Sequence, residues 1–60
     1  MFMVTVENQG NTFWLKSTTW AFQKDRGDTF ATKDDATAAI ERAKQFMVPA
    51  IRRKVQIVEA

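Results

Sequence analysis

The chain has 60 residues, 45% of them apolar, and its 9 Lys and Arg against 7 Asp and Glu give a formal net charge of +2. This length allows one domain and excludes a nucleotide-binding fold or a barrel. Cys and His are both absent, which excludes a disulfide scaffold and thiolate or imidazole ligands for a metal. We therefore expect a single domain over residues 1–60 that carries no cofactor.

Apolar residues do not gather into long runs, and the longest such run covers residues 1–4. A membrane-spanning helix needs about 20 apolar residues. A secretory signal needs a charged start and a longer apolar centre than any here. The sequence thus predicts a soluble cytoplasmic protein that makes no contact with a membrane.

The first element in the chain is a β-hairpin. Residues 2–7 are rich in β-forming side chains and alternate, so that Phe2, Val4 and Val6 share one side of a strand. Gly10 lies among Asn residues, and such a segment supplies the positive φ angles of a tight turn. Residues 12–16 then form the returning strand.

The segment from Trp20 to Ala31 is less well defined by its pattern. Residues 20–23 are compatible with a third strand, and residues 24–28 form a charged turn that contains Gly27. A short extended stretch follows at residues 29–31. A second hairpin and an irregular loop both remain open for this segment, so the sheet has three or four strands.

A helix is predicted over residues 33–47. Thr32 precedes it as the N-cap, and Asp34 and Asp35 in the first turn oppose the positive end of the helix dipole. The predicted buried side has helical spacing and consists of Ala36, Ala39, Ile40, Ala43, Phe46 and Met47. Pro49 ends the helix, because the residue before a proline disfavours the helical conformation.

A final strand is predicted over residues 54–59, with Val55 and Ile57 on one side and Val58 on the other. The elements together predict an α+β protein of two layers. Its sheet is largely antiparallel with three or four strands, and one helix packs across one face. The chain order is strand, strand, an optional strand, helix and strand.

The segment from Thr29 to Ala36, with its F-x-T-K-x-x-A helix start, resembles two groups of proteins. One group comprises small uncharacterised phage and bacterial proteins in which a hairpin precedes this helix start and a strand similar to residues 55–59 ends the chain. This resemblance covers most of the chain and implies no established activity. The other is the arm-type DNA-binding domain of tyrosine integrases. It is similar only in the middle of the chain, and it implies DNA binding through the sheet.

No set of residues predicts catalysis. Asp34 and Asp35 are adjacent on a helix and diverge, whereas acid–base chemistry needs carboxylates held at a set separation in a cleft. Asp25 and Asp28 lack the spacing of a calcium loop, and Ser17 has no histidine or activated lysine beside it. We therefore expect a protein that is not an enzyme.

Apolar side chains outnumber what one helix can cover. If the even-numbered side of residues 2–7 faces the helix, then Met3 and Trp14 lie on the opposite face, which Trp20 or Phe22 extends. An open face with Met and Trp is typical of an interaction surface. A shift of one residue in register would instead place Trp14 in the core.

The preferred hypothesis is a small interaction module that uses Met3, Trp14 and Trp20 to bind a protein partner or a second copy of itself. The resemblance to phage proteins implies a phage-encoded accessory protein in the host cytoplasm. The alternative is a DNA- or RNA-binding module, in which the sheet aromatics stack on bases or enter a groove and Lys16, Arg52, Arg53 and Lys54 contact phosphates. The simpler interpretation of the cations at residues 52–54 is that they protect an edge strand against aggregation.

Overall fold

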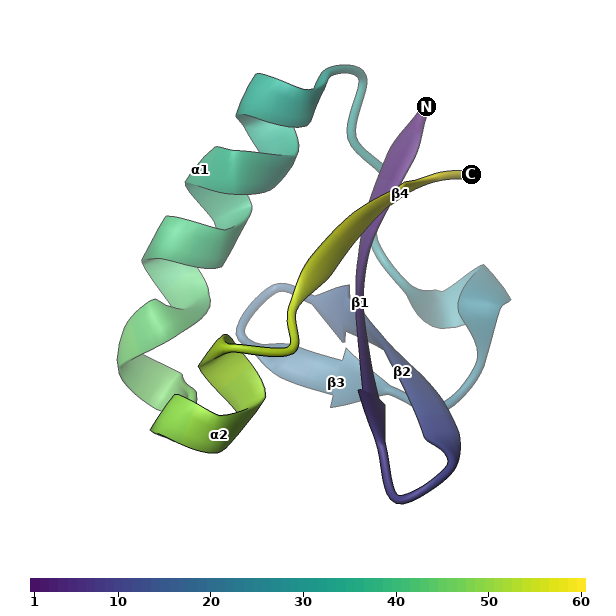
Figure 1. The fold of residues 1–60 in the computed structure, drawn as a ribbon. Helices are drawn as coiled ribbons and strands as arrows, with labels where there is room; N and C mark the ends of the chain where they lie inside the picture. Colours follow the sequence, from purple (N-terminus) through teal and green to yellow (C-terminus); the bar gives the residue numbers. More distant parts are fainter.

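A computed structural model describes all residues 1–60 and shows an α+β fold of two layers (Figure 1). The sheet contains β1 (Phe2–Asn8), β2 (Asn11–Lys16), β3 (Thr19–Ala21) and β4 (Gln56–Glu59). Their order is β3-β2-β1-β4, and every neighbouring pair is antiparallel. The predicted fold class is confirmed, and the third strand is present.

The hairpin between β1 and β2 closes with Asn8 opposite Asn11. The two residues between them, Gln9 and Gly10, have φ angles of 53° and 81°. Positive φ at both central positions belongs to the turn type whose twist matches that of paired strands. A glycine is needed at the second of these positions because a side chain there is strained.

The helix α1 (Lys33–Ala43) begins where the sequence predicts, with the Thr32 hydroxyl accepting a hydrogen bond of 3.1 Å from the Asp35 amide. It ends earlier than the predicted Met47, and a 3-10 turn, η2 (Lys44–Phe46), continues the chain. The tighter turn carries Phe46 away from the sheet, and 62% of its surface is exposed. The prediction that Phe46 fills the interface is therefore wrong.

A short second helix, α2 (Pro49–Arg52), follows η2 and was not predicted. Pro49 ends one helical segment and begins the next, because its fixed φ suits the first position of a helix. The predicted final strand starts two residues late, at Gln56. Arg52 consequently lies in a helix and does not lead directly into β4.

The core lies between α1 and the sheet. Val4 of β1 and Leu15 of β2 are the large side chains with almost no exposure. The helix approaches closely because its buried positions are alanines. The buried cluster consists of Val4, Leu15, Ala36, Ala39, Ala43 and Met47.

The opposite face of the sheet is covered in part by residues 24–31, which we call the strap. The strap starts with the 3-10 turn η1 (Lys24–Arg26) and lies across the sheet from α1 (Figure 1). The Asp28 amide donates to the Leu15 carbonyl (2.9 Å), and Phe30 and Phe2 exchange two backbone hydrogen bonds of 2.7 Å. Of the two alternatives for this segment, the structure therefore has an irregular loop after β3.

Candidate functional site

Met3 and Trp14 lie on the sheet face away from α1, as the alternation predicts. Val4 pairs with Ile57 on the helix side, whereas Thr5 pairs with Trp14 and Met3 pairs with Val58. The face is not open there, however. Met3 is 2% exposed and Trp14 is half-buried, because Gly27 of the strap lies directly against both. The prediction of an open surface at Met3 and Trp14 is wrong.

Trp20 lies on the other face from Met3 and Trp14. It pairs with Leu15, whose side chain is in the core under α1, and it packs against that core. The two-residue turn at Ser17 and Thr18 sets this register, with Ser17 at a φ of 57°. Grouping Trp20 with Met3 and Trp14 was therefore incorrect.

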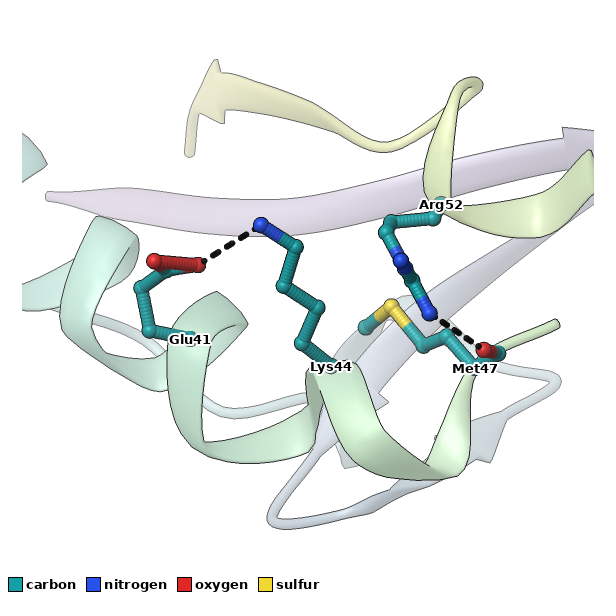
Figure 2. A network of polar contacts seen from close by, with 4 residues as sticks. All are labelled: Glu41, Lys44, Met47 and Arg52. Carbon is teal, nitrogen blue, oxygen red and sulfur yellow. Dashed lines mark hydrogen bonds and ion pairs between the residues drawn. The ribbon is translucent and has the colours of Figure 1, made fainter. Parts of the chain in front are cut away.

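The four cations predicted to contact nucleic acid come from different parts of the fold. Arg52 lies on α2, where its Nη2 donates to the Met47 carbonyl (3.3 Å; Figure 2). Lys54 borders a polar pocket of about 180 Å³ with Thr5, Glu7, Thr12 and Gln56. Lys16 lies at the far end of β2, and Arg53 is exposed at the end of α2.

The adjoining surface of α1 carries an ion pair between Lys44 Nζ and Glu41 Oε2 at 3.3 Å (Figure 2). Both side chains are about half exposed, and such a pair contributes little to stability. Lys44 is therefore paired within its own helix turn.

The structure forms an apolar groove on the helix side of β2 and β3. We call it the aromatic groove and define it by Phe13, Trp20, Phe22 and Ile51. Its volume is about 200 Å³, and Val6 and Asn8 complete its lining. The rings of Phe13 and Phe22 are 5.2 Å apart and meet edge to face at 66°. Phe22 is nevertheless 78% exposed.

Sequence reasoning missed this groove. Alternation along the strands places Phe13 on the same face of the sheet as Leu15, and Phe22 on the same face as Trp20. The sequence therefore contained a signal for these two pairs. The contribution of Ile51 to the groove could not be predicted from alternation, because Ile51 lies in α2, which is not part of the sheet. Helix α1 packs mainly on β1 and β4, and the groove lies toward the β3 edge of the sheet.

A second pocket lies beside β3 on the outer face. Its volume is about 360 Å³, and its outer-face lining includes Lys16, Ala21 and Arg26. Trp20, Phe22 and Gln23 complete it, so that it shares two aromatic residues with the groove. We call it the cationic pocket, because Lys16 and Arg26 are its charged residues. No carboxylate lines either cavity.

The acidic residues Asp28, Asp34 and Asp35 bind within the fold or lie in the first turn of a helix. The Asp28 carboxylate accepts a hydrogen bond of 2.8 Å from the Ser17 amide and so ties the strap to the turn after β2. Asp34 and Asp35 lie in the first turn of α1. No three His, Cys, Asp or Glu side chains come together as a metal site would require. No helix is long and apolar enough to cross a bilayer.

The fold and the cavities beside β3 define a small antiparallel α+β domain with an aromatic surface at one sheet edge. The chain matches no protein-family model, no curated protein and no solved structure. Its function therefore has to be inferred from its own residues.

Proposed function

We propose that this protein is a non-enzymatic module that binds a protein partner through the aromatic groove. The observation that carries the proposal is the exposed ring of Phe22. It is 78% exposed, yet its contact with Phe13 orients it over an apolar cavity. Large aromatic side chains that are already ordered bind a partner at little cost in conformational entropy.

The composition of the groove supports the same proposal. Trp and Phe are enriched at the centres of protein interfaces, and Trp is among the residues that most often dominate binding energy. Trp20 packs against the core under α1, so that it offers the partner a rigid surface. A rigid apolar cavity at an otherwise polar edge is a site that a partner's apolar side chain can fill.

Nucleic-acid binding is the second candidate, and the cationic pocket favours it. Lys16 and Arg26 lie there beside Trp20 and Phe22, and single strands are bound by such combinations of cations with stacking rings. A titration with single-stranded oligonucleotides at two salt concentrations tests it, because phosphate contacts weaken as salt rises. Absence of binding at low salt would reject this candidate.

A selection experiment tests the proposed function. A displayed library of random linear peptides is selected against the wild type, against Phe22→Ser and against Phe46→Ser. Phe46 is a matched control, because it is also a largely exposed phenylalanine but does not line the groove. We expect the wild type and Phe46→Ser to enrich the same apolar motif and Phe22→Ser to lose it.

The proposal fails if the wild type enriches no motif. It also fails if Phe22→Ser enriches the same peptides as the wild type. Circular dichroism of each variant shows whether a lost motif comes from a lost fold, and Phe22 is exposed enough for its replacement to leave the fold intact.

A further inference from the structure

The strand β3 leaves one edge of the sheet unpaired, and Trp20 presents its backbone there. The Leu15 carbonyl accepts from the Asp28 amide on the side away from β3. In an antiparallel pair, directly opposite residues both point their polar groups either inward or outward. Because Trp20 lies opposite Leu15, its N–H and C=O point to the free edge. None of the backbone hydrogen bonds outside the helices and strands involves Trp20.

The two cavities lie on either side of this edge. The aromatic groove opens on the face of α1, with Trp20 and Phe13 in its wall. The cationic pocket opens on the outer face, since Lys16 and Ala21 share the side of Trp14 and Arg26 belongs to η1. A strand added beside β3 would place alternate side chains into the groove and into the pocket.

The lining of each cavity determines which side chains it accepts. The aromatic groove takes an apolar side chain. The cationic pocket has Lys16 and Arg26 and no carboxylate, and it therefore favours a carboxylate from the partner. The sheet edge thus selects for apolar and acidic residues in alternation.

We infer that the partner is an extended acidic segment of another protein, which adds to β3 as a fifth antiparallel strand. Its apolar side chains enter the aromatic groove, and the acidic side chains between them face Lys16 and Arg26. This inference rests on the proposed function, and it specifies the partner's charge and backbone conformation.

A second copy of the chain is a poorer occupant. If two β3 strands paired, each would bring its own Lys16 and Arg26 to the same outer face, where like charges repel. The other free edge, β4, is also less suited. The cavity that borders β4 near Gln56 has no apolar lining residue and contains Glu7.

Fluorescein-labelled synthetic peptides test the inference by fluorescence anisotropy. The first peptide alternates Glu with Phe, Ile and Val, and its counterpart replaces each Glu with Lys. We expect the acidic peptide to bind the wild type roughly tenfold more tightly than the basic one at low salt. The double variant Lys16→Glu with Arg26→Glu should reverse this preference.

The variant Arg53→Glu with Lys54→Glu carries the same net charge but changes cations that line neither cavity beside β3. It should keep most of the preference for the acidic peptide. An equal loss in both double variants overturns the role of the cationic pocket, because it would show a response to net charge alone.

Methylation of the peptide backbone tests strand addition. In the antiparallel register opposite Trp20, the nitrogens of the apolar residues face β3 and those of the acidic residues face solvent. We expect N-methylation at the apolar residues to weaken binding roughly tenfold and N-methylation at the acidic residues to change it little. Equal binding of both methylated peptides overturns strand addition.

The outcomes separate this inference from the proposed function. If Phe22→Ser weakens acidic and basic peptides alike and the wild type does not distinguish them, the proposed function stands and the inference fails. If an oligonucleotide binds and no peptide does, both fail in favour of nucleic acid. If sedimentation shows a dimer of the wild type that Phe22→Ser dissociates, the occupant is a second copy and the inference fails.

Discussion

A Cβ atom at Gly27 would lie 2.6 Å from the Cβ of Trp14 and 2.8 Å from the Cε of Met3. The backbone of Gly27, with φ −76° and ψ 154°, is one that any residue adopts. The strap therefore needs glycine here for space alone. This contact closes the sheet face that the sequence predicted to be open, and it makes residue 27 a point where the fold can be tested.

Replacing Gly27 with Ala should destabilise the protein. The Cβ of Trp14 is close to the backbone of β2 and cannot move aside easily, so the strap must shift. We expect a loss of about 1–3 kcal/mol in the free energy of unfolding, as for other overpacked sites. Chemical denaturation followed by circular dichroism measures it.

The matched control for Gly27 is Gly10→Ala. Nothing lies within 4 Å of a Cβ atom at Gly10, but its φ of 81° is unfavourable for a side chain. The expected cost is about 1 kcal/mol from the backbone alone. A Gly27→Ala variant as stable as the wild type would contradict the close packing of the strap on Trp14.

Replacement by serine should lower the stability of the protein at Trp14 and leave it almost unchanged at Phe22. Trp14 is half-buried beneath Gly27, so Trp14→Ser should cost about 2 kcal/mol or more of stability. Phe22 is 78% exposed, and Phe22→Ser should change the melting temperature little. Equal melting temperatures for the two variants would show that Trp14 is not covered.

The N-cap of α1 gives a prediction about threonine. Thr32→Ala removes the hydroxyl that accepts from the Asp35 amide at 3.1 Å, and it should cost about 1 kcal/mol. Thr37→Ala is the control. Its hydroxyl donates to the Lys33 carbonyl within the helix (2.9 Å), and alanine is the better helix former by about 0.5 kcal/mol. We expect thermal denaturation to show a lower midpoint for Thr32→Ala and an unchanged or higher one for Thr37→Ala.

The turn between β1 and β2 offers a stabilising change. Gln9 has a φ of 53°, and asparagine tolerates this conformation better than glutamine does. Gln9→Asn would create the Asn-Gly pair that this turn prefers. We expect a gain of a few tenths of a kcal/mol in the free energy of unfolding. A loss of stability would indicate that the turn has another geometry.

Local rules were sufficient for much of the fold. The hairpin, the Thr32 cap, the start of α1 and the faces of Met3 and Trp14 all follow from alternation, capping and turn preferences. The candidate site was predicted less well. Trp20 was assigned to the wrong face of the sheet, because the register of β3 depends on the turn at Ser17 and Thr18.

The sequence by itself determined the β1–β2 hairpin, the start of α1 and the two-layer class, because each depends on neighbouring residues or on composition. Only the tertiary structure decided which faces are covered. The strap lies over Met3 and Trp14, and α1 packs mainly on β1 and β4, since contacts between distant segments are set by the packing of the whole chain. The aromatic groove exists because Ile51 and Phe22, which are far apart in sequence, meet in space.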